Sequence, residues 1–396
     1  MLRSLYSGIS GLRAHQTMLD VTGNNIANVN TTAFKASAIQ FQDTLSQLTQ
    51  GAGGPQAEIG GTNPAQVGLG VQVAGISTNF AQGSAQPTGR SEDVMISGDG
   101  FFVTSRGGDT MYTRAGSFAP DTAGSLVSPD GGILQGWNAV NGKITEGGKI
   151  GNLTFPMQAI ALAAATKTAT LGGNLPSDAA VDTVLTRDIE VFDASGEAET
   201  LTLNFTRTAT GWDVAGAVGS GPTATTSLTA NADGTLTFPA IPFEVSGGAG
   251  VISVEMSALT GFAGLTTVAI NNQDGRDAGE LEGFTLSKDG TLVGSFSNGA
   301  SEAIGRIVLA TFTNSGGLEK AGSSSYRATF NSGAAQIGTP GSGARGSLDG
   351  GALEMSNVDL SQEFTNLIVA QRGFQANARI ITTSDEVLQE LTNLKR

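Results

Sequence analysis

Both ends of this 396-residue chain carry apolar side chains three, four or seven residues apart, which places them on the core positions of a heptad repeat. The ten side chains are Leu5, Ile9, Leu12, Leu19 and Ile26 near the start, and Phe364, Leu367, Phe374, Ile381 and Leu388 near the end. This heptad spacing is typical of helices that pack along a seam in a coiled coil or bundle. The pattern predicts one helix within residues 1–30 and another within 358–396.

The two predicted seams could pack within one chain or between chains. Most amphipathic helices simply pack on the body of their own domain. Here Gln16, Gln371 and Asp385 occupy three of the seam positions, and polar residues at such positions often set the register of a larger assembly. The apolar pattern alone leaves both alternatives open, and the polar positions favour assembly. We therefore expect the ten seam residues to form an assembly interface.

Between the two helices the apolar period changes to two, which predicts strands. The clearest runs are Val67–Ile76, Val94–Thr104, Ile189–Phe192, Leu201–Phe205, Val251–Met256 and Ile307–Phe312. Gly, Asn, Asp and Pro clusters bound these runs, as at Asp193–Gly196 and Asp289–Gly290. Because strands do not alternate with helices, we expect an antiparallel all-β middle. The predicted fold class is therefore mainly β with terminal α-helices.

The charge distribution excludes several classes of partner. The formal net charge is −14, and residues 145–284 hold 16 acidic and 5 basic side chains. Such a segment is a poor partner for nucleic acid or anionic lipid. No apolar run approaches the roughly 20 residues that a membrane span needs. Arg13, His15 and Asp20 interrupt any apolar core of a cleavable signal, so a different export route is expected if the protein leaves the cytoplasm.

Residues with catalytic or metal-binding chemistry are scarce. The chain has no Cys, which excludes disulfides and thiolate sites, and one histidine, His15, which excludes multi-His metal sites. His15 flanks the N-terminal seam, where we expect a packing or interface role. Gly341–Gly346 matches GxGxxG, but Pro340 precedes it and no helix pattern follows, so a loop is expected. Acidic pairs such as Glu280 and Glu282 fit a solvated surface. We expect no catalytic residues, cofactor or metal, and no enzyme activity.

A signature follows the N-terminal seam. The stretch Leu19–Thr31, followed by Phe34-Lys35, resembles the N-terminal signature of the flagellar rod and hook protein family. Its signature residues are Asn24, Asn25, Ile26, Ala27, Asn28, Asn30, Phe34 and Lys35. Ala33 stands where family members usually carry Gly, which accepts positive φ more readily than Ala does.

Further similarities follow in family order, so that the resemblance covers about residues 1–140 and 285–396. They include Gly100-Phe101-Phe102, Tyr112-Thr113-Arg114, Gly351–Glu354, Ser356–Leu360 and Ile368–Arg372. Rod and hook proteins share these motifs. Distal rod proteins of the family lack a large β insertion, whereas residues 145–284 form one here, so a hook subunit is favoured. A distal rod subunit is the closest alternative, and a secreted β-rich adhesin or glycosidase is the alternative from another class.

The resemblance implies a layered arrangement of domains. Residues 1–30 and 358–396 would pair as a coiled-coil-like inner layer, and 31–70 would be a linker. Residues 71–144 and 285–357 would form an inner β-domain, with 145–284 inserted as an outer β-domain, so that two antiparallel all-β domains lie outside the helices.

The resemblance also implies partners and a location. The chain would polymerise with itself into a flexible tubular joint and would contact the rod, the hook cap and the hook–filament junction proteins. The flagellar type III export apparatus would carry it outside the cell without a cleavable signal peptide. No nucleic-acid partner and no membrane insertion are expected.

Overall fold

The computed structural model describes residues 2–55, 60–140, 142–154, 160–231, 233–238 and 242–393, without the side chain of Leu2. The chain divides into two compact units, which we describe separately. Unit 1 comprises Met1–Phe155, Thr285–Val293 and Ala303–Arg396, and unit 2 comprises Pro156–Phe284 and Gly294–Glu302.

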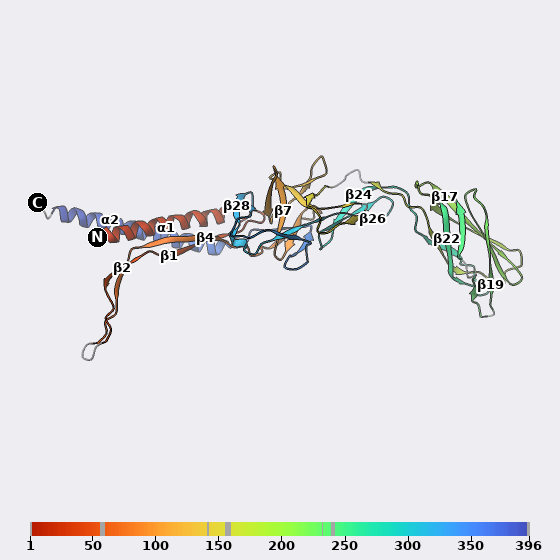
Figure 1. The fold of residues 1–396 in the computed structure, drawn as a ribbon, viewed down its shortest axis with the longest axis horizontal. Coiled ribbons are helices and arrows are strands. Elements are labelled where there is room, and N and C mark those ends of the chain that lie inside the picture. Colours follow the sequence, from red (N-terminus) through yellow and green to blue (C-terminus); the bar gives the residue numbers. More distant parts are fainter. Residues whose placement is uncertain are drawn as a thin grey trace. The chain divides into compact units, whose positions relative to one another are not determined.

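Two helices at the ends of the chain lie side by side in unit 1 (Figure 1). They are α1, Leu2–Ala27, and α2, Leu360–Asn393, and they confirm the two helices predicted from the heptad spacing. Asp359 caps α2, because its Oδ1 accepts hydrogen bonds from the backbone N–H groups of Ser361 at 2.8 Å and Gln362 at 3.2 Å.

Two antiparallel strand pairs follow α1. Strand β1, Ser37–Asp43, pairs with β4, Val71–Thr78, next to α1, and β2, Ser46–Gln50, pairs with β3, Ala65–Gly68. Residues 31–70, expected as a linker, therefore contain three strands.

The continuous strand predicted over Val67–Ile76 is wrong, because Gly70 interrupts it with φ +124°. A Cβ at Gly70 would lie 2.1 Å from Ser10 Oγ. The chain therefore approaches α1 too closely at this point for a side chain, and the ladder restarts at Val71.

The remaining strands of unit 1 form its β-domain. They are β5 (Ala85–Pro87), β6 (Val94–Ser97), β7 (Phe101–Arg106), β8 (Asp109–Thr113), β9 (Ala119–Pro120), β10 (Leu126–Val127), β11 (Ile133–Val140), β12 (Lys143–Ile144), β13 (Gly151–Asn152), β27 (Leu309–Thr311), β28 (Glu319–Gly322), β29 (Ser325–Arg327), β30 (Gln336–Gly338), β31 (Ser347–Gly350) and β32 (Ala352–Glu354). A short 3-10 helix, η1, spans Ser315–Gly317. Edge-to-face aromatic contacts join Phe101 to Phe80, Phe312 and Tyr326 in the core.

Unit 2 is a β-sandwich. Its strands are β14 (Ile160–Ala161), β15 (Thr168–Asn174), β16 (Val184–Phe192), β17 (Ala198–Arg207), β18 (Gly211–Val218), β19 (Ala224–Ala230), β20 (Leu236–Thr237), β21 (Phe243–Gly247), β22 (Gly250–Thr260) and β23 (Ala269–Gln273), while β24 (Gly279–Leu286), β25 (Thr291–Phe296) and β26 (Ser301–Ile307) contribute residues to both units. A four-stranded sheet, β21-β22-β15-β23, and a five-stranded sheet, β16-β17-β18-β19-β20, share one apolar core. Alternation along β17 places Leu201, Leu203 and Phe205 in it, each fully buried.

One strand pair departs from the predicted antiparallel arrangement. Strands β15 and β22 run parallel, with Thr168 opposite Ser253 and Asn174 opposite Thr260. Parallel neighbours need a long crossover connection. Here the whole five-stranded sheet and β21 lie between them in the sequence, so the chain can return in the same direction. The other pairs described in the two units are antiparallel, as predicted.

Candidate assembly surface

The two terminal helices meet through their smallest residues. Gly8, Gly11 and Ala14 are buried on α1, and Ala370 is buried on α2. A Cβ at Gly11 would lie 2.7 Å from the Asn377 side chain. The glycines carry no side chain and the alanines only a methyl group, which allows the two backbones to approach closely.

His15 explains the glycine within α2. A Cβ at Gly373 would lie 2.4 Å from His15 Nε2, so the imidazole occupies the space that a side chain would fill. The ring centroid of His15 lies 6.1 Å from that of Phe41, and its Nδ1 has no hydrogen-bond partner. This environment fits the packing role that we predicted for the only histidine.

The predicted seam residues are only partly covered by the paired helix. Leu5, Ile9, Leu12, Leu19, Ile26, Leu367, Phe374, Ile381 and Leu388 are half-buried, whereas Phe364 is exposed. The covered face of α2 includes Glu363, Ala370 and Asn377, so the seam within the chain is rotated away from Phe364 and Gln371. The hydrophobic pattern missed this because glycine, alanine and asparagine contribute little to an apolar period.

Large apolar side chains remain exposed on several sides of α2. They are Leu360, Phe364, Ile368, Val369, Ile380, Val387 and Leu391, with exposed fractions between 39% and 57%. On α1, Tyr6 is 66% exposed. Large apolar side chains exposed in this number are typical of surfaces that contact a partner.

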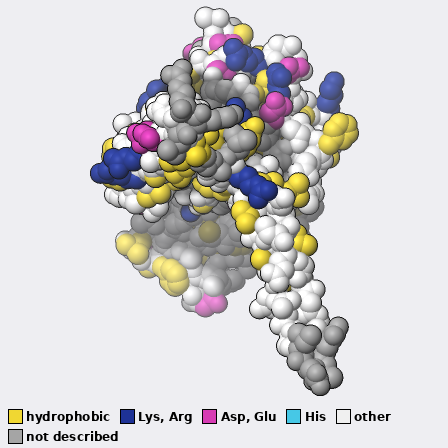
Figure 2. All heavy atoms as spheres, turned by 90° about the vertical axis from the view of Figure 1, so that its left-hand side faces the viewer, with side chains coloured by type: hydrophobic (Ala, Val, Ile, Leu, Met, Phe, Trp, Pro, Cys, Tyr) yellow, Lys and Arg dark blue, Asp and Glu magenta, His cyan; other side chains and the backbone are white. Residues whose placement is uncertain are grey.

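The strand pair β2–β3 adds a second exposed surface (Figure 2). All of its residues are exposed on both faces, including Leu48 at 55% and Val67 at 46%. Between Asp43 and Arg90 the sequence contains one charged residue, Glu58, which lies outside the described residues. Because an isolated two-stranded hairpin is marginally stable in water, this one is suited to being covered by a partner.

The asparagines of the family signature organise the end of α1. Buried Asn25 donates through Nδ2 to the Ser37 carbonyl at 2.8 Å and to Glu363 Oε1 at 3.0 Å, and its Oδ1 accepts from the Ser37 N–H at 3.0 Å. Asn28 donates to the Asn24 carbonyl at 3.0 Å. The signature therefore joins α1 to β1 and to the first turn of α2.

The other signature residues lie in different environments. Asn24, Ala27 and Asn30 are exposed, Ile26, Asn28 and Phe34 are half-buried, and Lys35 is buried. Ala33 adopts φ +57° although it is not Gly, and its N–H donates to the Glu354 carbonyl at 2.8 Å. The left-handed turn typical of glycine is thus kept with a buried methyl group in its place.

A buried ion cluster connects the two ends of the chain to the β-domain. Lys35 Nζ donates to Glu354 Oε1 at 2.6 Å and to the Ala81 carbonyl at 2.8 Å. Arg114 Nη1 lies 3.5 Å from Glu354 Oε2, and all three charged side chains are at most 2% exposed. Burial lowers the pKa of the Lys35 ammonium, and its hydrogen bond to Glu354 opposes that shift. Removing one partner would leave an uncompensated buried charge.

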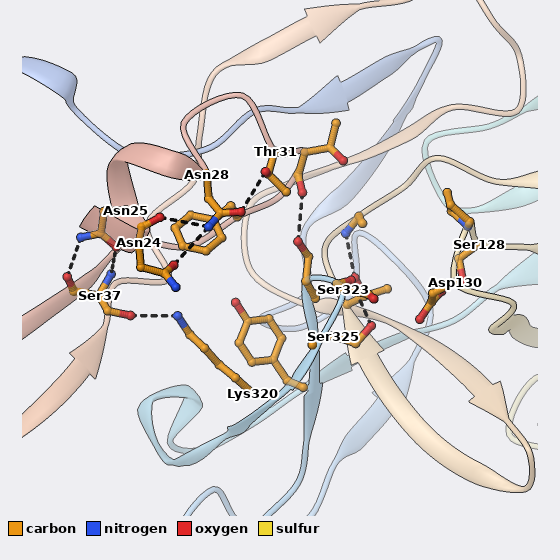
Figure 3. A pocket seen from close by; sticks show the side chains of 18 of the residues that line it. Asn24, Asn25, Asn28, Thr31, Ser37, Ser128, Asp130, Lys320, Ser323 and Ser325 are labelled. Carbon is orange, nitrogen blue, oxygen red and sulfur yellow. Dashed lines mark hydrogen bonds between the residues drawn. The ribbon is translucent and has the colours of Figure 1, made fainter. Parts of the chain in front are cut away.

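A cavity of about 760 Å³ lies between the end of α1, the β28–β29 hairpin and the loop around Ser128 (Figure 3). Its polar side chains largely bond to one another or to nearby backbone, as when Lys320 Nζ donates to Ser37 Oγ at 2.8 Å and Ser128 Oγ donates to Asp130 Oδ1 at 2.5 Å. Burial raises the pKa of Tyr326 to about 12, so this phenol stays neutral. The cavity lining contains no histidine.

No metal-binding arrangement emerges in the described part of the chain. No group of three or more His, Asp or Glu side chains is placed there to hold a metal ion. Residues 341–346, the GxGxxG match, lie in a turn with no helix behind it. Neither described helix is long and apolar enough to cross a membrane.

Comparison with known protein families gives three matches along the chain. Residues 5–35 match the flagella basal body rod protein model, and residues 95–170 match the flagellar hook protein FlgE/F/G D1 domain. Residues 349–394 match the flagellar basal body rod FlgEFG protein C-terminal model. The first match contains the signature, and the last contains the whole of α2.

Curated relatives match the chain along its whole length. The flagellar hook protein FlgE of Treponema pallidum is 38% identical over 463 residues, covering 100% of both chains. The flagellar hook protein FlgE of Escherichia coli is 36% identical over 414 residues, covering 98% of each. The flagellar basal-body rod protein FlgG of Bacillus subtilis is 35% identical over 397 residues, covering 100% of both. The chain therefore belongs to the flagellar hook protein family of structural, non-enzymatic subunits.

Proposed function

We propose that this chain assembles into the hook tube through its two terminal helices, and that the tube acts as a flexible joint transmitting torque from rod to filament. The observation that supports this most directly is the exposure of Phe364, Ile368 and Val369, each more than half exposed although α2 already packs on α1. Neighbouring copies would cover these side chains and the half-buried seam residues.

The burial of these side chains favours assembly. Covering one half-exposed Leu, Ile, Val or Phe contributes roughly 1 kcal/mol at about 25 cal/mol per Å². Several such side chains on each copy would add several kcal/mol to the contact that the two helices already make with each other, against the conformational entropy lost when the ends are ordered. Folding of the terminal helices would then be coupled to polymerisation.

The two units have different roles in this proposal. Residues 1–30 and 358–396 form the inner layer, 71–144 and 285–357 the inner β-domain, and 145–284 the outer domain. The acidic balance of residues 145–284 supports an outward, solvated position. A charged surface of this kind suits outer domains that slide past one another when the tube bends.

The location and the heterologous partners follow from the same proposal. Polymerisation within the flagellum is a property of the family. The finer expectation is that the chain leaves the cell through the flagellar type III apparatus and meets the rod, the hook cap and the hook–filament junction proteins. Unfolded terminal segments would suit passage through a narrow secretion channel.

Electron microscopy of basal bodies from cells that lack this gene tests the proposal. Complete rods without hooks are expected. Truncated rods would instead make the chain a distal rod subunit, the alternative favoured by the match to a rod protein. Intact flagella would contradict both assignments and would favour the remaining alternative, a secreted adhesin.

A further inference from the structure

One exposed aromatic side chain belongs neither to the terminal helices nor to the β2–β3 strand pair. Phe330 follows β29 in unit 1 and is fully exposed, more than any other large hydrophobic side chain in the described part of the chain. It is not one of the ten predicted seam residues, and it lies outside the β2–β3 hairpin. Burying a whole phenyl ring would contribute about 1.5–3 kcal/mol of stabilisation, so the exposure of Phe330 needs an explanation.

The loop that presents Phe330 is held firmly by hydrogen bonds. Thr329 Oγ1 donates to the Gly317 carbonyl at 2.6 Å, and the Thr329 N–H donates to Ser332 Oγ at 2.9 Å. Asn314 Nδ2 donates to the Asn331 carbonyl at 2.9 Å, and Ser332 is fully buried. The residues on both sides of Phe330 are therefore fixed to η1 and its flank.

This loop packs so closely on η1 that a side chain at Gly317 would not fit between them. A Cβ at Gly317 would lie 2.7 Å from the Asn331 carbonyl carbon and from the Ser332 nitrogen. A loop fixed in this way loses little conformational entropy when it binds, which is the property of a preorganised anchor.

The segments around Phe330 carry no charge. The sequence has no Asp, Glu, Lys or Arg between Arg327 and Arg345, and none from Thr311 to Leu318. The whole chain has a net charge of −14, so two copies repel one another overall, and an uncharged patch adds nothing to that repulsion. An uncharged surface with an exposed aromatic residue is the composition found at the centre of protein interfaces.

We propose that Phe330 is an anchor residue that inserts into the surface of a second copy of this chain. The second copy is the occupant because members of this family polymerise and because an uncharged patch allows two acidic chains to meet. A single protruding ring buries little against an identical ring, so the contact is heterologous, as an open helical polymer requires. The inference deepens the proposed assembly function and rests on it.

Substitution Phe330→Ser in the full-length chain tests the anchor. The melting temperature of the monomer should not change, because the ring contacts nothing within its own chain. The critical concentration for polymerisation should rise tenfold or more, as expected for loss of an anchoring aromatic residue. Val140→Ser is the matched control, since Val140 is 72% exposed in the same unit and lies on β11, which β7 and β8 separate from β29 in the sheet.

A chemical footprint provides an independent readout. The chain contains no Cys, so Phe330→Cys introduces the only thiol. This thiol should react with a maleimide in the purified monomer and be protected in tubes assembled from this chain alone.

Three outcomes would overturn the anchor. They are an unchanged critical concentration for Phe330→Ser, a thiol that stays reactive in the tubes, and a lower melting temperature of the Phe330→Ser monomer. In contrast, failure of the wild-type chain to form tubes would contradict the proposed function itself.

Discussion

The terminal helix pair and the β-sandwich of unit 2 use their apolar side chains in opposite ways. In the sandwich, Leu203, Phe205 and Val214 are fully buried in a core that both sheets share. In the helix pair, small residues such as Gly11 and Ala370 are buried, while Phe364 and Ile368 are more than half exposed. The sandwich satisfies its hydrophobic surface within one chain, and the helix pair does not.

This difference separates a region that folds alone from one that is completed by neighbours. A sandwich with a closed core keeps its stability at any protein concentration. A helix pair that exposes its larger side chains gains stability when copies assemble, so its stability should depend on protein concentration. Substitutions in the two regions should therefore have separable effects.

The largest expected effect is on assembly. Leu388→Asp places a charge where a half-buried leucine now lies, and desolvating it costs several kcal/mol. We expect polymerisation to be abolished while the calorimetric unfolding of the sandwich is unchanged. Gln375→Asp is the matched control, since it adds the same charge at an exposed position of α2. Normal tubes formed by Leu388→Asp would contradict the seam assignment.

The reciprocal substitution lies in the sandwich. Phe205→Ala removes a fully buried ring and should lower the free energy of unfolding of unit 2 by about 3–5 kcal/mol. Calorimetry should show an earlier transition for this unit, and tubes should still form below that temperature. Val251→Ala, at a 56% exposed position of the same unit, should change stability little. Loss of polymerisation in Phe205→Ala at low temperature would mean that the sandwich itself contributes to assembly.

The sequence predicted the features that depend on local periodicity. The heptad steps located α1 and α2, and alternation located the strands around Leu201 and Val254, because both periods follow from backbone geometry. The signature also contains Asn25 and Lys35, which the sequence singled out only by resemblance and which the structure places in buried hydrogen-bonded positions. No periodic pattern assigns Asn25 its bonds to Ser37 and Glu363.

Features that depend on distant pairing could not be predicted in this way. Lys35 and Glu354 lie 319 residues apart in the sequence, so no local pattern joins them. The parallel β15–β22 pair depends on how the intervening sheet crosses over. The close helix contact depends on Gly11 and Gly373, which a hydrophobic period treats as empty positions. The sequence therefore did not predict the long-range contacts or the packing through small residues.

The helix contact itself can be tested at Gly373. Gly373→Ala would place a Cβ 2.4 Å from His15 Nε2, and the forced separation should destabilise the helix pair by about 1–3 kcal/mol. Thermal melting followed by far-UV circular dichroism measures this change. Gly23→Ala is the control, because nothing lies within 4 Å of its new Cβ and alanine favours a helix by about 1 kcal/mol. The double variant with His15→Ala should recover most of the loss, and no recovery would place the strain elsewhere.

The smallest expected effect is at Ala33, where unit 1 keeps a left-handed residue with a buried methyl group. Ala33→Gly relieves about 1–2 kcal/mol of strain. It also loses about 0.8 kcal/mol of methyl burial and about 0.5–1 kcal/mol through added backbone entropy. These contributions nearly cancel, so the free energy of unfolding of unit 1 should change by less than about 0.5 kcal/mol. Without a positive φ the same substitution would lack the strain relief and would cost about 1–2 kcal/mol. A calorimetric loss of that size would therefore show that Ala33 is not held in the left-handed conformation, and a near-zero change would show that the buried methyl group balances the strained turn.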